Sequence, residues 1–132
     1  AVPEVLDQLR LVGLKTAIAS NSTPERIARF LETGHLQGRF DAVCSGADFG
    51  RGKPEPDVYL KTAEKLQVKP EHCLVFEDIP MGILAGKRAG MQVCAIEDDY
   101  SIHLTAEKKA LADYYITDFR QVLDHTYEDL RK

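Results

Sequence analysis

Three short groups of polar residues follow apolar runs in the sequence, and their types suit chemistry on a phosphate group. They are Ser20 with Asn21, the single Lys53, and the adjacent Glu77 and Asp78. A hydroxyl with nearby backbone N–H groups binds an oxyanion, and an ammonium group neutralises one. Adjacent carboxylates bind hard cations such as Mg²⁺. Together these groups supply what a Mg²⁺-dependent phosphoryl-transfer site requires.

Each group also has an ordinary structural interpretation. Ser20 begins a turn that leads to Thr23, which has the residue type of a helix N-cap. A lone lysine such as Lys53 is common in exposed loops, and acidic pairs are common in solvated turns. Residue types alone leave these alternatives open for each group. The order of all three groups, each at or near the end of an apolar segment, favours one shared site.

The glycine and lysine stretches at 46–53 and 82–87 do not form a nucleotide-binding P-loop. That motif has four residues between its glycines and Ser or Thr after its lysine, whereas Pro54 and Arg88 follow the lysines here. The sequence also lacks H-E-x-x-H and a G-x-G-x-x-G after a strand. We therefore expect isolated surface histidines at His35, His72, His103 and His125.

Apolar runs and helical periodicity alternate along the chain. They predict helices over 3–12, 24–33, 56–66, 82–89, 105–112 and from 118 onward, and strands over 15–20, 40–45, 73–76, 92–96 and 114–117. Strands separated by helices of this length predict an α/β fold, a Rossmann-like parallel sheet with helices on both faces. Sites in such sheets lie beyond the carboxyl ends of the strands, so Ser20, Lys53 and Glu77 are expected on one rim.

The composition limits the class of protein. A length of 132 residues suits one domain, residues 1–132, and 17 Lys and Arg against 21 Asp and Glu argue against nucleic acid or an anionic membrane as partner. The cysteines are odd in number and form no C-x-x-C pair, so we expect reduced core thiols at Cys44, Cys73 and Cys94. With no long apolar run and no leader-like start, the sequence predicts a soluble, cytoplasmic protein.

The three groups lie in segments that resemble motifs of the haloacid dehalogenase-like (HAD) hydrolase superfamily, close to its phosphatase and β-phosphoglucomutase-like members. Residues 16–21 resemble the family's second motif, and residues 52–57 resemble its third. Residues 75–78, with the glycines that follow, resemble its fourth, and the resemblance covers roughly residues 1–123. The resemblance implies that Ser20, Asn21 and Lys53 bind the substrate phosphate, with Ser20 and Lys53 catalytic. It implies that Glu77 and Asp78 position Mg²⁺.

The first motif of the family, Asp-x-Asp on a central strand, does not occur in the 132 residues. In the family its first Asp is the nucleophile and its second the general acid/base, and a helical cap that selects substrates is commonly inserted before the second motif. Asp98 and Asp99 are adjacent and follow a late predicted strand, so we do not assign them that role. We expect an HAD-like core that lacks the first strand and the cap, and that is inactive alone.

A parallel sheet without its middle strand either leaves backbone groups unpaired or closes the strand at 15–20 against the strand at 73–76. Either arrangement predicts low stability or self-association through the incomplete sheet. The expected function is the core of a Mg²⁺-dependent hydrolase of a small phosphorylated metabolite, acting through an aspartyl-phosphate. Alternatives are a non-catalytic phosphate-binding or regulatory domain and a β-phosphoglucomutase-like phosphomutase. A response-regulator fold fits less well, because the acidic pair lies late in the chain.

Overall fold

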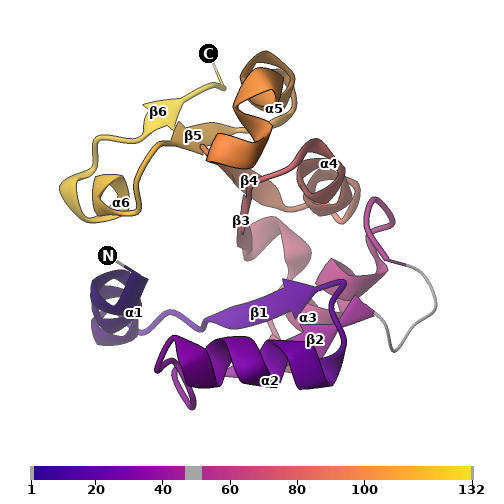
Figure 1. The fold of residues 1–132 in the computed structure, drawn as a ribbon, viewed down its shortest axis with the longest axis vertical. Helices are drawn as coiled ribbons and strands as arrows, with labels where there is room; N and C mark the ends of the chain where they lie inside the picture. The colour runs from indigo at the N-terminus through magenta and orange to yellow at the C-terminus, as the bar shows by residue number, and fades with distance from the viewer. Residues whose placement is uncertain (1, 47–51, 132) are drawn as a thin grey trace.

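The computed structural model describes residues 2–46 and 52–131. Helices and strands alternate along most of this length (Figure 1). The helices are α1 (Val2–Leu11), α2 (Pro24–Thr33), α3 (Asp57–Leu66), α4 (Pro80–Arg88), α5 (Thr105–Leu111) and α6 (Arg120–Asp124), with 3₁₀ helices η2 (Pro70–His72) and η3 (Asp99–Leu104). The strands are β1 (Ala17–Ser20), β2 (Ala42–Ser45), β3 (Leu74–Glu77), β4 (Gln92–Ile96), β5 (Tyr114–Ile116) and β6 (Glu128–Asp129). The predicted α/β class is confirmed.

The described strands form two sheets rather than one. β1 pairs with β2 in parallel, from Ala17 opposite Ala42 to Ser20 opposite Ser45. β3, β4 and β5 form a parallel set, and β6 adds to β5 in the antiparallel direction. Within the described residues β1 and β3 are therefore not hydrogen-bonded to each other. Of the two expected arrangements, the sheets remain separate instead of closing on one another.

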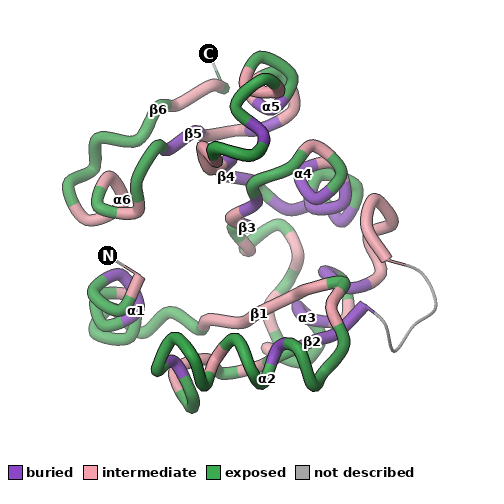
Figure 2. The backbone as a smooth tube through the Cα atoms, in the orientation of Figure 1, coloured by how far each residue is buried: buried purple, intermediate pink, exposed green. Residues whose placement is uncertain are grey.

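One cluster of buried apolar residues includes members of both sheets. Figure 2 shows where buried residues lie along the backbone. It contains Cys44 from β2, Val58 from α3, and Val75, Ile83 and Val93 from β3, α4 and β4. α3 packs on β1 and β2, whereas α4 packs on β3 and β4. The core beneath α3 and α4 therefore joins two sheets that share no strand pairing among the described residues.

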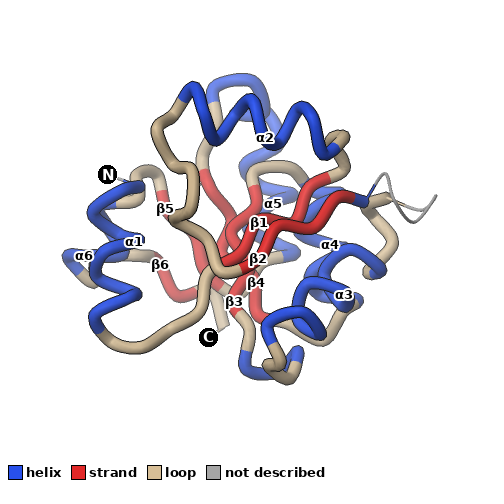
Figure 3. The backbone as a smooth tube through the Cα atoms, turned by 90° about the horizontal axis from the view of Figure 1, so that it is seen from below, coloured by secondary structure: helices blue, strands red, loops and turns tan. Residues whose placement is uncertain are grey.

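The helices cover both faces, as predicted. α1 contacts α6 on one side of the strands, and α4 contacts α5 on the other (Figure 3). Small residues let α4 approach its sheet closely, because a Cβ added at Gly86 would lie 2.7 Å from Val93 Cγ2. Gly86 thus allows close packing of α4 on β4.

Local sequence signals set the bounds of α2. Thr23 precedes the helix, and its Oγ1 accepts from the backbone N–H of Arg26 at 3.3 Å, while Pro24 occupies the first helical position. Gly34 follows the last turn, and its N–H donates to Phe30 O at 3.0 Å. The predicted helix over 24–33 is confirmed residue for residue.

The C-terminal region differs from the predicted long amphipathic helix. α6 ends at Asp124, and His125 adopts a left-handed conformation with φ of 59°. The Gln121 side chain accepts from the Thr117 N–H at 2.6 Å and donates to Thr126 O at 3.1 Å, which closes the chain into a short turn of helix. The chain then turns back, so that β6 can pair with β5. Apolar spacing alone did not reveal this edge strand.

The structure shows how far each cysteine is buried and whether it is a free thiol. Cys44 and Cys94 are buried, and Cys73 is partly buried against the core; all three are free thiols. The expectation of core thiols thus holds for two cysteines, while Cys73 lies at the edge of the core. None of the helices in the described residues has the length and apolar character needed to cross a lipid bilayer.

Candidate active site

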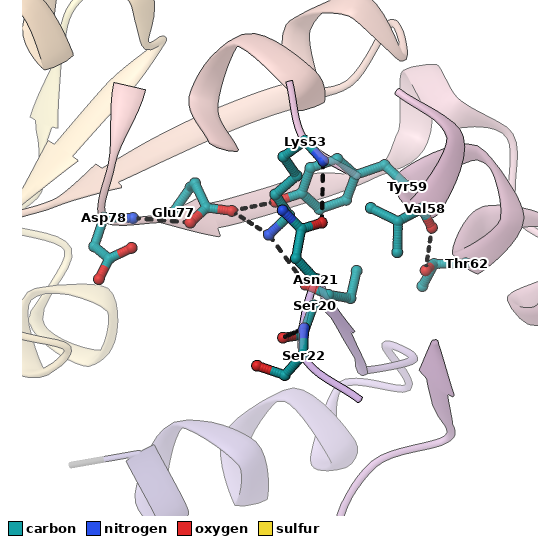
Figure 4. Close-up of polar contacts among 10 residues, drawn as sticks. Ser20, Asn21, Ser22, Lys53, Val58, Tyr59, Thr62, Glu77 and Asp78 are labelled. Atoms are coloured by element: carbon teal, nitrogen blue, oxygen red, sulfur yellow. Dashed lines mark hydrogen bonds and ion pairs between the residues drawn. The ribbon is translucent and has the colours of Figure 1, made fainter. Parts of the chain in front are cut away.

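The polar groups singled out in the sequence meet at the carboxyl ends of β1 and β3 (Figure 4). Lys53 comes from the segment before α3. Its Nζ donates to the Ala19 carbonyl of β1 at 3.2 Å and to Glu77 Oε2 at the end of β3 at 2.6 Å. One ammonium group therefore links the ends of strands that belong to different sheets.

Glu77 is held at both carboxylate oxygens. Its side chain is 10% exposed, and that of Lys53 is 11% exposed. A buried ion pair needs further hydrogen bonds to offset the loss of hydration. Oε2 also accepts from the Tyr59 hydroxyl, and Oε1 accepts from the Asp78 N–H at 3.3 Å. These contacts fix the carboxylate against Lys53.

Gly82, in the first turn of α4, gives the Glu77 side chain its space. A Cβ at this position would lie 2.0 Å from Glu77 Cδ and 2.3 Å from Oε2. Any side chain here would displace the carboxylate, so glycine is a requirement of the site. Gly86 makes room for packing of α4 on the sheet, whereas Gly82 makes room for a site residue.

Tyr59 is a site residue that the sequence did not single out. It lies on the buried side of α3, and Lys53 Nζ is 4.9 Å from its ring centroid. Burial and the neighbouring Glu77 carboxylate raise the pKa of the Tyr59 hydroxyl well above its usual value. It is therefore a neutral hydrogen-bond donor at physiological pH. The available signal was that a buried tyrosine hydroxyl needs a polar partner.

Asn21 connects the end of β1 to the segment that carries Lys53. Its Oδ1 accepts from the Lys53 backbone N–H at 3.0 Å. A Cβ at Gly46 or at Gly52 would lie 2.9 or 2.7 Å from that same Oδ1, so both glycines allow the close approach. This contact positions Lys53. A direct contact of Asn21 with phosphate stays a prediction.

Ser20 shapes the turn after β1. Its Oγ accepts from the Ser22 N–H at 3.1 Å, an arrangement that leaves the hydroxyl proton of Ser20 free to point elsewhere. Ser45, at the end of β2, donates to the Ser22 carbonyl and closes the turn from the other strand. Residues 47–51 of the predicted glycine-rich loop lie outside the described residues.

Asp78 is exposed at the rim beside Glu77. Partial burial of its carboxyl group raises its pKa, and the hydrogen bond and charge of Glu77 raise it further. The described residues hold no cluster of three or more His, Cys, Asp or Glu side chains. Mg²⁺ needs fewer, because it commonly takes one or two carboxylates together with waters and substrate phosphate. Asp78 and Glu77 Oε1 fit that donor set, whereas Oε2 is occupied by Lys53 and Tyr59.

The histidines lie where the sequence predicted. His35, His72, His103 and His125 are all exposed. Asp98 caps η3, with its Oδ1 accepting from the Tyr100 N–H at 3.4 Å. Asp98 thus has a local structural use.

Comparison with known proteins identifies close relatives. A model of the haloacid dehalogenase-like hydrolase family matches residues 1–90. Phosphoglycolate phosphatase of Aquifex aeolicus (strain VF5) is 40% identical over 89 residues, which are 67% of this chain and 42% of that protein. Validoxylamine A 7′-phosphate phosphatase of Streptomyces hygroscopicus subsp. limoneus is 33% identical over 120 residues, 90% of this chain and 54% of that protein.

Solved structures agree with the sequence relatives. The crystal structure of a HAD family hydrolase from Deinococcus radiodurans R1, with bound phosphate and sodium, matches with a TM-score of 0.82 and 31% identity. The match covers 92% of this chain and 57% of that one. The chain therefore spans about half the length of the relatives it matches.

Proposed function

This chain belongs to the haloacid dehalogenase-like hydrolase family, and on that premise we propose that it is the core of a Mg²⁺-dependent phosphatase. The proposed reaction is hydrolysis of a phosphate monoester of a small metabolite. An aspartate attacks phosphorus, a second acid protonates the leaving oxygen, and water then hydrolyses the aspartyl-phosphate. The names of relatives that act on phosphoglycolate and validoxylamine phosphate support this substrate class.

The contact of Lys53 with the ends of β1 and β3 is the observation that supports this function most strongly. An ammonium group has three donors, and two of them reach Ala19 O and Glu77 Oε2. The third is available for a phosphate oxygen at the same rim. With its side chain 11% exposed, Lys53 acts where water screens charge weakly, so its charge is effective in stabilising negative charge on a transferring phosphate.

The residues around Lys53 complete the proposed phosphate site. The Ser20 hydroxyl donates to a second phosphate oxygen, since its own oxygen is engaged as an acceptor. Asn21 keeps Lys53 at the rim through the Lys53 backbone N–H and offers its amide nitrogen to the phosphate. In this assignment Ser20 and Lys53 are catalytic residues, and Asn21 is both a phosphate ligand and a positioning residue.

Asp78 and Glu77 Oε1 would hold Mg²⁺, which supplies positive charge to the phosphate oxygens when bound. The two carboxylates then have different tasks. Glu77 fixes Lys53 through Oε2 and would offer Oε1 to the metal, whereas Asp78 would offer its side-chain carboxylate. Both remain acceptors during the reaction.

The nucleophilic aspartate is not among the 132 residues, so the proposal locates it on a further strand. We place that strand between β1 and β3. Within the described residues, β1 pairs only with β2 and β3 pairs only with β4, so each has one unpaired edge. A parallel strand there would end at the rim next to Ser20, Lys53 and Glu77. The 132-residue chain alone is then expected to bind phosphate and Mg²⁺ weakly and to hydrolyse nothing.

Hydrolysis of p-nitrophenyl phosphate, with and without Mg²⁺, tests the proposal in the complete gene product and in the 132-residue chain. Lys53→Ala and Asp78→Ala in the complete protein should reduce the rate by at least about a thousandfold. Lys61→Ala is the control, because Lys61 lies on the exposed face of α3. Unchanged rates in the two site variants would refute the assignment.

Assays of the complete protein also distinguish the phosphatase from the two alternative functions. Phosphate binding by the complete product without any hydrolysis favours a non-catalytic, phosphate-binding role. Exchange of phosphate between positions of a sugar phosphate, without net release of phosphate, favours a phosphomutase. Mg²⁺-dependent release of inorganic phosphate that Lys53→Ala abolishes favours the phosphatase.

A further inference from the structure

Lys108, on α5, is a charged residue without a role in the proposed site, yet it is completely buried. Its Nζ donates to the Ile96 carbonyl at the end of β4 at 2.6 Å and to Ser101 Oγ at 3.2 Å. Burying an ammonium group is costly, and an apolar side chain of similar volume commonly packs as well. A buried lysine on α5 therefore suggests a task that an apolar side chain would not perform.

The contacts of Lys108 lead to Asp78. Ser101, 4% exposed and part of η3, donates from its Oγ to the Asp78 carbonyl oxygen at 3.1 Å. Lysine has donors only, so Ser101 Oγ must accept from Lys108. The single hydroxyl proton of Ser101 is then committed to the Asp78 carbonyl. The charge of Lys108 thereby fixes the direction of a hydrogen bond to the main chain of Asp78.

The same contacts tie together two strand ends. Ile96 ends β4, which lies beside β3 with Glu77 opposite Ala95. Lys108 holds the first of these ends directly, and through Ser101 it holds the residue that follows the second. A contact with Ile96 alone would anchor α5, whereas the extension through Ser101 reaches the turn that carries both carboxylates.

We propose that Lys108 and Ser101 are positioning residues that hold Asp78 in its metal-binding position through its backbone carbonyl. The proposal rests on the proposed function, because it treats Asp78 as a Mg²⁺ ligand. The buried ammonium also supplies positive charge near the carboxylates. Burial and the charge of Glu77 raise the pKa of Asp78, and the charge of Lys108 acts in the opposite direction.

Ser101→Ala gives the sharpest test, since it leaves Lys108 bound to the Ile96 carbonyl and removes the hydroxyl that links Lys108 to Asp78. Thr105→Ala is its matched control, because Thr105 Oγ1 also donates to a backbone carbonyl nearby, that of Ile102 at 2.6 Å. Lys108→Met is the second variant, with Lys109→Met as control. Lys109 lies on the same helix and pairs at the surface with Glu128.

Mg²⁺ affinity of the complete protein, measured by calorimetry, is the first readout. Ser101→Ala and Lys108→Met should each weaken Mg²⁺ binding about tenfold, the usual effect of removing a group that orients a metal ligand. Because both variants break one chain of contacts, the double variant should be no weaker than either single variant. Thr105→Ala and Lys109→Met should bind Mg²⁺ as the native protein does.

Amide hydrogen exchange in Mg²⁺-free buffer is the second readout, and it does not depend on metal binding or activity. Peptides that contain residues 77–83 should exchange about tenfold faster in Ser101→Ala than in Thr105→Ala, because the turn loses its anchor. Equal exchange, or equal Mg²⁺ affinity, in these two variants would overturn the positioning role, even if Lys108→Met fails to fold. A native protein without Mg²⁺ affinity overturns the proposed function instead, while faster exchange would still support the anchoring of the turn.

Discussion

Replacing Gly82 with alanine tests whether the position of Glu77 depends on the lack of a side chain in the first turn of α4. The added Cβ would lie 2.0 Å from Glu77 Cδ and 2.3 Å from Oε2. Glutamate is flexible, but here Lys53 and Tyr59 both hold Oε2 and only 10% of the side chain is exposed. We therefore expect Gly82→Ala to push the carboxylate away from both partners.

Two opposing effects set the change in the free energy of unfolding. Alanine in place of glycine stabilises a helix by about 1 kcal/mol. Breaking a buried ion pair with its hydrogen bonds costs about 3–5 kcal/mol. The net loss is about 2–4 kcal/mol, which corresponds to a fall in Tm of roughly 10 °C for a domain of this size. The clash therefore outweighs the gain in helix propensity.

Urea unfolding, monitored by circular dichroism, measures this change in the free energy of unfolding. Repeating the substitution in a variant that lacks the Glu77 carboxylate tests whether the clash is its cause. In Glu77→Ala the atoms that the new Cβ meets are gone, so Gly82→Ala should stabilise that variant by up to about 1 kcal/mol. Gly34→Ala is the control, since a Cβ there meets Phe30 O at 3.4 Å and Leu36 Cδ1 at 3.5 Å. A loss of equal size in both backgrounds, or no loss in the native background, would refute the reasoning.

Three further outcomes follow from the site and the sheets. Lys53→Met leaves Glu77 without its counter-ion, so urea unfolding should show a loss of about 3 kcal/mol in the free energy of unfolding. Adding Glu77→Gln to Lys53→Met should recover part of that loss. A double variant whose loss equals the sum of the two single losses would contradict this. Asp78→Asn should raise the free energy of unfolding at pH 7, because a raised pKa means that the ionised carboxylate is less stable in the folded state than in the unfolded chain. That gain should disappear as the pH falls below 3.8, the ordinary value for this carboxyl, and a gain independent of pH would show that charge is not its cause. The 132-residue chain should self-associate through its incomplete sheets, seen as a sedimentation coefficient that rises with concentration; a monomer at all concentrations would exclude this.

The sequence predicted the elements of the fold wherever the signal is local. Thr23, Pro24 and Gly34 bound α2 through capping contacts within a few residues, so the helix could be placed accurately. The pairing of β6 with β5 joins segments more than ten residues apart, and it depends on the turn around His125 rather than on apolar spacing. The partition into two sheets likewise depends on which strands are neighbours, which periodicity does not encode.

In the candidate site, too, some residues could be predicted from the sequence and others could not. The rule that sites lie at the carboxyl ends of strands selected Ser20, Lys53 and Glu77 from their positions alone. Tyr59 and Gly82 were missed because their contacts with Glu77 come from two different helices, and nothing near them in the sequence indicates a carboxylate. A tyrosine on an apolar helix face is counted as core until its hydroxyl partner is known.

The geometry also changes what the acidic pair means. The sequence grouped Glu77 and Asp78 together as metal ligands. In the structure Glu77 gives one oxygen to Lys53 and Tyr59, while Asp78 remains exposed. Since β1 and β3 share no backbone hydrogen bonds among the described residues, the Lys53 contact with Ala19 and Glu77 is a direct polar link between the strand ends. A change in the position of Glu77 must therefore move the proposed phosphate-binding lysine as well. In the proposed site, phosphate and metal binding would be coupled through this one ion pair, so a methyl group at Gly82 should disturb both.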